Sequence, residues 1–307
     1  MTVRGERSGG TAPRNGGRSA LRAESDRLIG AALREDIGEG DFTTLWTVRS
    51  SARAEAVIVA KARLVVAGVW IARRVFSRVE PDARIELLVE DGVAVDPGTG
   101  LLRVRGPARG LLTAERTALN FLGRLSGIAT LTGRFVEAVA GTSAMITDTR
   151  KTTPGWRLLE KWAVRTGGGV NHRAGLDDMI LIKDNHIAAA GGAREAVVRV
   201  AASNRRALEV EVEVPTPAAV EELRGLPVRR ILLDNMDEDG LREAVSRVAR
   251  WPEPRPELEA SGNISLERVR GVAVTGVDWI SVGALTHSAP VADLSLRIRP
   301  VASEEEG

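Results

Sequence analysis

A regular alternation of apolar runs and amphipathic segments after about residue 130 is the feature that most constrains the fold of this chain. Short apolar runs bounded by turn residues are typical of buried strands, and apolar residues at helical spacing are typical of helices. Strands that alternate with helices predict parallel βαβ units, whose crossover helices cover the sheet. The predicted strands fall near residues 144–147, 179–182, 208–213, 230–233, 257–260 and 278–282, and the predicted helices around 156–165, 193–203, 217–224, 239–249 and 265–271.

The length of this region favours an incomplete barrel. It covers residues 131–288, whereas a complete eight-stranded α/β barrel typically needs about 250 residues. We therefore predict an α/β protein whose catalytic domain is an open α/β barrel. A doubly wound sheet is the competing geometry, and the periodicity alone does not separate the two.

The preceding residues, 21–130, have a different character and predict a separate N-terminal α+β sandwich domain, on which residues 289–307 could pack. Residues 1–20 contain four arginines, five glycines and almost nothing to bury, so we expect a disordered tail. The predicted strands are 54–60, 63–69, 84–88 and 101–105, and the predicted helices are 21–33, 69–79 and 113–128.

Charge and composition argue against several classes of protein. With 43 Lys+Arg against 41 Asp+Glu, the net charge of +2 is too balanced to predict nucleic-acid binding. The chain has no cysteine, which suits a reducing compartment. The strongest apolar run, residues 64–72, is far shorter than the roughly 20 residues that span a bilayer. We expect a cytoplasmic protein with no nucleic-acid or membrane partner.

Cationic side chains gather where predicted strands end. Arg150 and Lys151 follow the strand 144–147, and Lys183 follows the strand 179–182. Side chains at the carboxyl ends of parallel strands face the ligand sites of α/β folds. The alternative is a solvated face with ordinary surface pairs, but the position of these residues favours an anion site.

A helix is predicted between these two strands. Thr153 is expected to cap it and Pro154 to occupy its first turn. Arg157, Lys161 and Arg165 are expected on its solvent-exposed side.

Acidic side chains follow a second pattern. The strand near residues 208–214 alternates, with Glu209, Glu211 and Glu213 on one face, and the strand 230–233 runs into Asp234. The face of three glutamates is either the exposed face of an edge strand or the inward face of a barrel strand. Carboxylates beside cations suggest Mg²⁺ on a pyrophosphate, or the stabilisation of positive charge that develops on a sugar.

Glycine-containing turns follow the last two strands, and bare backbone N–H groups there can bind a phosphate. The turns are Ser261-Gly262-Asn263 and Gly283-Ala284-Leu285. Cations, carboxylates and a phosphate site together describe phosphoribosyl transfer.

Motifs along most of the chain resemble those of the quinolinate phosphoribosyltransferase family. In order they are GEGDFTT, ERTALNFLGRLSGIAT, DTRKTTPG, GGGVNHR, LIKDNH, EVEV, LLDN, EASGNI and VGALTHS, and they cover about residues 21–298. The resemblance implies the conversion of quinolinate and phosphoribosyl pyrophosphate to nicotinate mononucleotide, pyrophosphate and CO2 with Mg²⁺, a step of de novo NAD biosynthesis. It also implies a homodimer with its sites at the subunit interface.

The same resemblance implies roles for individual residues. Arg150, His172, Arg173 and Lys183 would hold the quinolinate carboxylates, and Arg116, which by itself reads as a surface residue, would complete the pocket from the partner subunit. Lys151, Glu213 and Asp234 would surround the ribose and pyrophosphate, with Mg²⁺ near Glu213 and Asp234, directly or through pyrophosphate and water. Ser261, Gly262, Gly283 and Ala284 would hold the 5′-phosphate, with His287 nearby. Trp156 and Trp162, less usual in this family, are interpreted either as packing changes or as changes in residues that support those in contact with the substrate.

Three alternatives stay open at this point. The first is a related phosphoribosyltransferase that acts on nicotinate or another acid. The second is a Schiff-base barrel lyase that uses Lys183 or Lys151, and the third is a non-catalytic binding protein on the same fold.

Overall fold

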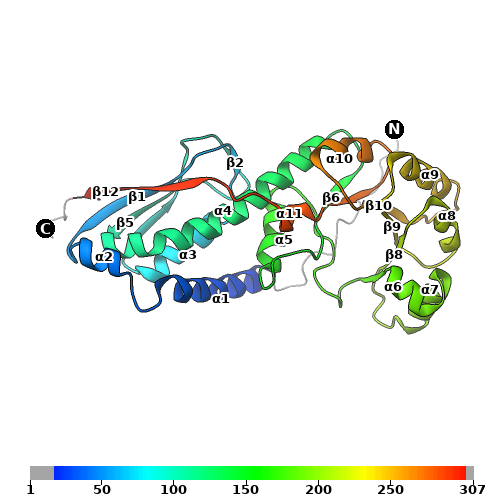
Figure 1. Ribbon diagram of the computed structural model, residues 1–307, viewed down its shortest axis with the longest axis horizontal. Coiled ribbons are helices and arrows are strands. Elements are labelled where there is room, and N and C mark those ends of the chain that lie inside the picture. Colours follow the sequence, from blue (N-terminus) through cyan, green and yellow to red (C-terminus); the bar gives the residue numbers. More distant parts are fainter. Residues whose placement is uncertain (1–16, 302–307) are drawn as a thin grey trace. The chain divides into compact units, whose positions relative to one another are not determined.

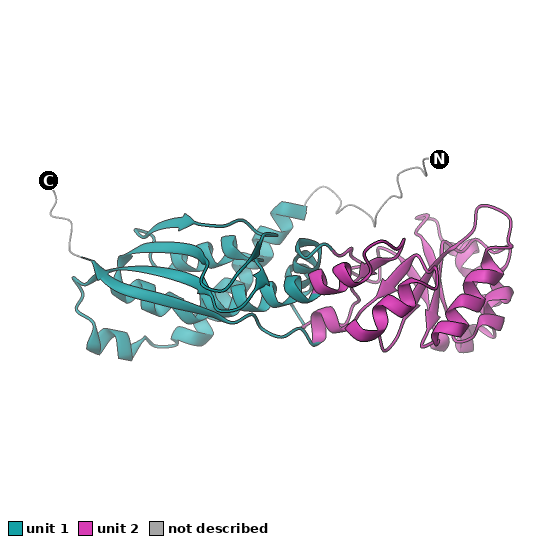
Figure 2. Cartoon of the chain, turned by 90° about the horizontal axis from the view of Figure 1, so that it is seen from above, with its two compact units in different colours: residues 1–131, 154–168, 288–307 teal, residues 132–153, 169–287 magenta. Residues whose placement is uncertain are grey.

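The computed structural model describes residues 17–301 (Figure 1). The chain forms two compact units, drawn in different colours in Figure 2. Within the described residues, unit 1 comprises 17–131, 154–168 and 288–301, and unit 2 comprises 132–153 and 169–287. None of the helices in this described part is long and apolar enough to cross a membrane.

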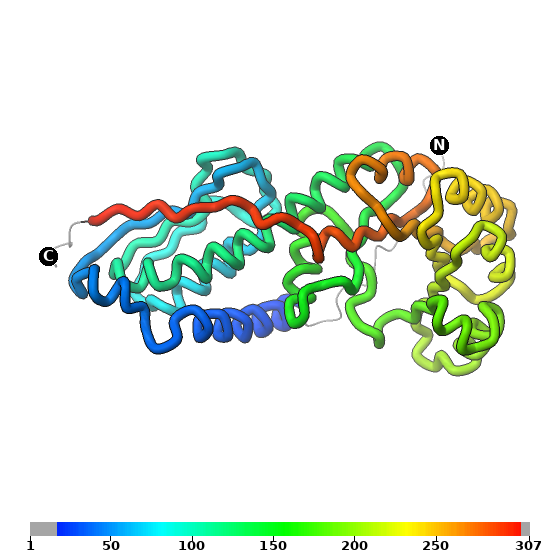
Figure 3. The backbone as a smooth tube through the Cα atoms, in the orientation of Figure 1, coloured from blue at the N-terminus to red at the C-terminus, as the bar shows by residue number. Residues whose placement is uncertain are grey.

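Unit 1 is built on a four-stranded antiparallel sheet with the order β12-β1-β5-β3. β12, at the end of the chain, pairs with β1 along the full length of both strands, and the two ribbons run side by side in Figures 1 and 3. The helix α3 packs on β3 and β5 and buries Ile71, Val75 and Phe76 completely. The elements are α1 (Gly17–Ile37), α2 (Phe42–Thr47), β1 (Arg53–Ala60), β2 (Leu64–Val65), α3 (Val69–Val79), β3 (Arg84–Leu87), β4 (Ala94–Val95), β5 (Gly100–Pro107), α4 (Ala108–Ala138), α5 (Arg157–Thr166) and β12 (Leu294–Val301). The last residues of α4, from 132 on, belong to unit 2.

Two expectations about helix starts were wrong. Residues 17–20 belong to the first turn of α1, because Leu21 is buried and anchors that end of the helix; the rest of the expected tail, residues 1–16, lies outside the described residues. The helix α5 begins at Arg157 rather than beside Thr153, because Gly155 has a φ of +80° and interrupts the chain before it. Lys161, expected on the surface, is buried.

Both unusual tryptophans pack against aromatic side chains of unit 1, which confirms their interpretation as packing residues. Trp156 stacks on Phe121 with ring centroids 4.8 Å apart, and Trp162 meets Trp70 edge to face at 6.0 Å. Such aromatic pairs contribute about 0.5–1.5 kcal/mol beyond their buried area.

Unit 2 carries the predicted open α/β barrel. Its six strands are all parallel, in the order β6-β11-β10-β9-β8-β7, so that β6 and β7 are the two edges. The strands are β6 (Met145–Thr147), β7 (Ile180–Ile182), β8 (Val210–Val214), β9 (Arg230–Asp234), β10 (Glu257–Ser261) and β11 (Trp279–Ser281). The helical segments are α6 (Asp184–Ala190), α7 (Ala193–Ser203), α8 (Pro217–Val220), the 3₁₀ turn η1 (Glu221–Leu223), α9 (Glu238–Val248), α10 (Leu266–Ala273) and α11 (Ala284–His287).

Glycines in the helix α4 allow the segment around residues 290–292, which follows the barrel, to pack closely against this helix. The Gly123 carbonyl accepts a hydrogen bond from the Ala292 N–H at 3.0 Å. A Cβ placed at Gly127 would lie only 2.0 Å from the Pro290 carbonyl oxygen. Because that oxygen belongs to the backbone, neither side can yield without moving the chain.

We therefore expect Gly127→Ala to lower the free energy of unfolding by about 1–3 kcal/mol, the cost of overpacking a filled site. Gly30→Ala in α1 is the matched control, since its Cβ would meet only the flexible ends of Arg34 and Arg78 at 3.4 Å. That change should be neutral or stabilising by up to about 1 kcal/mol, because alanine favours a helix interior. Urea denaturation of both variants measures the difference, and equal effects would contradict the close approach.

Candidate functional site

A cavity of about 850 Å³ opens in unit 2, and the residues that follow the strands of the barrel line it. Every site residue predicted from the sequence lines this cavity except Arg116: they are Arg150, Lys151, His172, Arg173, Lys183, Glu213, Asp234, Ser261, Gly262, Gly283, Ala284 and His287.

Cations occupy one part of the lining. Arg150 follows β6, and its Nε is buried without a hydrogen-bond partner in the described part of the chain. The guanidinium of Arg173 donates to the Met179 carbonyl at 3.2 Å. Burial lowers the pKa of Arg173, and the neighbouring Arg150 charge lowers it further. Two neighbouring guanidinium groups whose charges repel each other favour the binding of an anion between or beside them.

Lysines extend this cationic lining. Lys183 precedes α6, and its Nζ lies 3.0 Å from a carboxylate oxygen of Glu213. The backbone at Lys151 is fixed by Thr286, whose hydroxyl donates to the Lys151 carbonyl at 2.8 Å.

Two carboxylates face the same cavity from adjacent strands. Glu213 is on β8 and Asp234 ends β9, and these strands are hydrogen-bonded to each other in parallel. One oxygen of Asp234 accepts from the Asn235 amide at 2.8 Å. Carboxylate oxygens open to a shared cavity fit Mg²⁺, which prefers one or two protein carboxylates together with phosphates and water.

The turn after β10 needs glycine because two strand ends approach closely. Gly262 has a φ of +93°, and a Cβ there would lie 2.2 Å from the Asn235 side-chain oxygen. Asn263 donates its amide to that same oxygen at 3.1 Å. Asn235 and Asn263 also line the cavity. Asn263 lies in a glycine-containing turn that the sequence had already indicated, whereas nothing in the sequence pointed to Asn235.

A buried charged cluster forms part of the cavity wall, where His172 and Glu259 belong to the lining. Glu211 and Glu259 are fully buried, and His172 Nε2 lies 3.0 Å from the first and 3.5 Å from the second. Arg230 binds Glu259 at 2.8 Å and stacks over Trp279, with 4.1 Å from Cζ to the ring centroid. Of the three glutamates of the predicted face, Glu211 is buried and Glu213 lines the cavity, as an inward barrel face requires. Glu209 precedes β8 and is exposed, so the inward face does not extend to it.

The pKa values in this cluster follow from burial and from the two carboxylates. Burial raises the pKa of Glu211, and the charge of Glu259 raises it further. Burial lowers the pKa of His172, but Glu259 and the hydrogen bond with Glu211 outweigh it, so the pKa of His172 is raised. Glu259 and Arg230 were missed by the sequence interpretation, although an acid or a base inside an apolar run was visible there.

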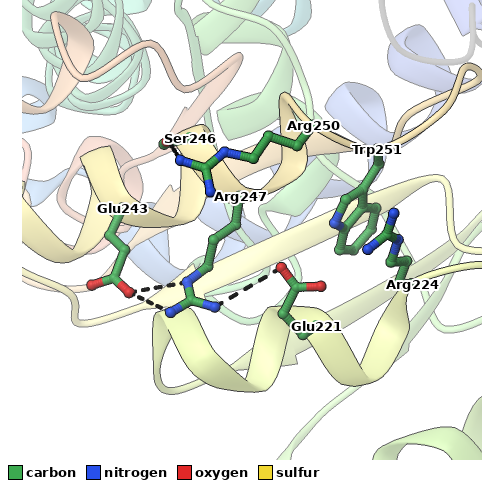
Figure 4. A pocket seen from close by; sticks show the side chains of 7 residues that line it. All are labelled: Glu221, Arg224, Glu243, Ser246, Arg247, Arg250 and Trp251. Carbon is green, nitrogen blue, oxygen red and sulfur yellow. Dashed lines mark hydrogen bonds and ion pairs between the residues drawn. The ribbon is translucent and has the colours of Figure 1, made fainter.

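Two other features lie outside this cavity. Arg116 is on α4 in unit 1, with an exposed side chain. A second hollow of about 370 Å³ lies against the outer helical layer of unit 2 (Figure 4). Its Arg247 is already paired with Glu243 at 2.6 Å and Glu221 at 3.9 Å, so it is largely charge-balanced.

The barrel and its cavity define a class of protein: an α/β-barrel enzyme that binds an anionic substrate beside a pair of carboxylates at the carboxyl ends of the strands. Comparison with known proteins narrows this class. The model of the quinolinate phosphoribosyltransferase C-terminal domain matches residues 128–297, and that of the N-terminal domain matches residues 41–126. The chain belongs to the quinolinate phosphoribosyltransferase family, which confirms the resemblance seen in its motifs.

Individual relatives agree with this assignment. A chloroplastic nicotinate-nucleotide pyrophosphorylase (carboxylating) of Oryza sativa is 44% identical over 290 residues, which cover 88% of this chain and 76% of the relative. A probable enzyme of the same name from Synechocystis is 42% identical over 266 residues, which cover 87% and 90%. The crystal structure of NadC from Streptococcus pyogenes superimposes with a TM-score of 0.86 at 38% identity, and covers 91% of this chain and 98% of that one.

Proposed function

We propose that this chain transfers the phosphoribosyl group of phosphoribosyl pyrophosphate to quinolinate and removes one carboxylate as CO2, giving nicotinate mononucleotide and pyrophosphate. The observation that carries the proposal is the single cavity in which Arg150, Arg173 and Lys183 lie with Glu213 and Asp234. Cations alone would suit any polyanion. Carboxylates in the same cavity suit a sugar that becomes positively charged during transfer.

Quinolinate carries two adjacent carboxylates on a pyridine ring, and guanidinium forks bind such groups in a bidentate manner. Arg150 and Arg173 supply the forks in this proposal, and Lys183 supplies a further charge. His172 forms part of the wall of the same pocket. A substrate with only one carboxylate would leave part of this positive charge without a partner.

The proposed transfer forms the bond between the pyridine nitrogen and C1′ and breaks the bond between C1′ and the pyrophosphate oxygen. Glu213 and Asp234 stabilise the positive charge that develops on the ribose, and Lys151 stabilises the departing pyrophosphate. The turns at Ser261-Gly262 and Gly283-Ala284 hold the 5′-phosphate, with His287 beside them.

Decarboxylation follows on the alkylated ring. The bond between the carboxylate and the carbon next to the ring nitrogen breaks. Its electron pair stays on that carbon, where the adjacent positive nitrogen stabilises it, and a proton then takes the place of the lost CO2. The residues of the cavity orient and desolvate the carboxylate for this step.

Mg²⁺ is the proposed metal, held near Glu213 and Asp234 directly or through pyrophosphate and water. When bound it supplies charge neutralisation for the pyrophosphate. A cytoplasmic location is also part of the proposal, supported by the absence of cysteine from the sequence.

A homodimer in which Arg116 reaches the partner's pocket is the proposed assembly. If each site combines Arg116 of one subunit with Arg173 of the other, Arg116→Ala and Arg173→Ala chains should complement each other. Random pairing makes about half of the dimers heterodimers, and each heterodimer has one intact site and one doubly altered site. The mixture should therefore regain about a quarter of wild-type activity. Turnover by co-expressed chains measures this, and a mixture no more active than its components would contradict a shared site.

Parallel assays of the purified chain with quinolinate, nicotinate and nicotinamide test the proposed reaction. Quinolinate should be consumed with release of CO2, and the other two should react poorly. Preferential use of nicotinate would instead identify the related phosphoribosyltransferase. Trapping by borohydride with a carbonyl substrate would identify a lyase that uses Lys151 or Lys183.

A further inference from the structure

The side chain of His172 is held from within the barrel. Its backbone N–H donates to Asp148 at 2.9 Å, and its ring nitrogen Nε2 contacts Glu211 at 3.0 Å. Its other ring nitrogen, Nδ1, lies 2.8 Å from the backbone nitrogen of Arg173. Only 6% of the side chain is exposed, so the ring is set into the wall of the cavity rather than extended into it.

The backbone N–H of Arg173 decides the state of the ring, because an amide N–H can only donate. Nδ1 must therefore accept, and a neutral imidazole whose Nδ1 accepts carries its hydrogen on Nε2. That hydrogen is donated to Glu211. The nearby carboxylates favour a doubly protonated ring, but such a ring would turn two donors toward each other at Nδ1 and lose the bond to Arg173.

The buried charges around the His172 ring explain why His172 is the hydrogen-bond donor to Glu211. Glu211 comes from β8 and Glu259 from β10, and both side chains are fully buried. Arg230 is the cationic partner of Glu259 at 2.8 Å, so Glu211 is left with His172 as its hydrogen-bond donor. The ligand atoms of His172, Glu211 and Glu259 lie within 4.8 Å of one another, but the guanidinium of Arg230 already fills the role that a metal would have.

We propose that Glu211 and His172 are positioning residues: Glu211 fixes the hydrogen of His172 on Nε2, and His172 in turn fixes the backbone of Arg173, whose guanidinium faces the substrate. On this proposal neither ring nitrogen of His172 bonds to the substrate, because Glu211 and the Arg173 N–H engage both. The proposal thus replaces the direct carboxylate contact that the resemblance implied for His172. The proposal refines the pyridine dicarboxylate pocket and so rests on the proposed function. Such a chain of contacts matters because the guanidinium of an arginine keeps a fixed orientation only when the residues that hold its backbone and side chain are themselves fixed.

Spectroscopy on the unmodified protein tests the tautomer directly. The chain has three histidines, so ¹⁵N-histidine labelling yields few ring signals, and His172→Asn identifies the one that belongs to His172. With pH held above the raised pKa of His172, the neutral ring should carry its hydrogen on Nε2. It should keep this state when quinolinate is added without phosphoribosyl pyrophosphate. An imidazolium, a hydrogen on Nδ1, or a change of ring protonation with quinolinate would overturn the proposal.

Kinetics test the consequence for binding. Glu211→Gln keeps the shape of the side chain but removes its charge and can offer the ring a donor in place of an acceptor. We expect the KM for quinolinate to rise about tenfold, as for loss of a hydrogen bond to a charged group, and the KM for phosphoribosyl pyrophosphate to change by less than about twofold. An unchanged KM for quinolinate, or an equal rise in both constants, would overturn the role of Glu211.

Glu257→Gln is the matched control. Glu257 lies two positions before Glu259 on the same strand, contacts Arg230 at 3.7 Å and accepts from Trp279 Nε1 at 2.9 Å. Glu257 contacts neither His172 nor Glu211, so Glu257→Gln should leave the KM for quinolinate unchanged. A wild-type chain that fails to bind or convert quinolinate would refute the proposed function, whereas the tautomer of the free protein is measured independently of that outcome.

Discussion

Arg173→Ala should lower kcat/KM for quinolinate by about 100-fold or more. Arg173 is half-buried, its guanidinium donates to the Met179 carbonyl at 3.2 Å, and it lines the cavity beside Arg150. Truncating one partner of a buried charge pair costs about 2–5 kcal/mol, since the other charge is left without its partner. Steady-state kinetics with quinolinate varied at saturating phosphoribosyl pyrophosphate measure the effect.

The matching control is Arg194→Ala, an exposed arginine in α7 of the same unit that is not among the lining residues. It should leave both substrate constants unchanged. Arg173→Lys should recover only part of the loss, because an ammonium group lacks the planar fork of a guanidinium. Unaltered kinetics in Arg173→Ala would reject its assigned role in carboxylate binding.

Asp234→Asn should lower kcat by about 100-fold while the KM for quinolinate changes little. Removing one preorganised group aimed at developing charge typically costs about 100- to 1000-fold in kcat. Asp234 is a cleaner probe than Glu213, because Glu213 is also the ion-pair partner of Lys183 at 3.0 Å. Single-turnover kinetics separate the chemical step from product release and measure the expected change.

Asp237→Asn controls for the loss of an acid close to the same strand end. Asp237 caps α9 by accepting from the Gly240 N–H at 2.8 Å and does not line the cavity. Because asparagine keeps the accepting side-chain oxygen and caps helices about as well as aspartate, the change should leave both stability and kcat nearly unchanged. If Asp234→Asn raised only the KM for quinolinate, Asp234 would contribute to quinolinate binding rather than to the stabilisation of charge on the ribose, which would contradict the proposed role.

The barrel could be predicted from the sequence because its elements repeat locally. Each apolar run from β6 to β11 lies within about two residues of its predicted position, since a buried parallel strand needs a short unbroken apolar segment. The lining residues could be predicted for the same reason. Arg150, Lys183 and Asp234 follow strands directly, and the ends of parallel strands meet at one edge of the sheet.

Features that depend on distant partners could not be predicted. Arg230 and Glu259 pair across β9 and β10. A charge inside an apolar run is visible in the sequence, but the partner on another strand that allows its burial is not. The strand β12 was missed because its partner β1 lies far earlier in the chain and its own residues are mostly exposed. The helix α4 is longer at both ends than predicted, since glycines such as Gly110 mask its helical pattern.

The place of β12 also bears on how the molecule is made. Residues emerge from the ribosome in order, and early domains commonly fold before later ones appear. Here β1 stays without its neighbour on one side until Leu294–Val301 has been synthesised, after the whole barrel. The nascent N-terminal sheet therefore carries an unprotected edge throughout translation of the barrel, which makes it a natural client for chaperones that shield exposed strands.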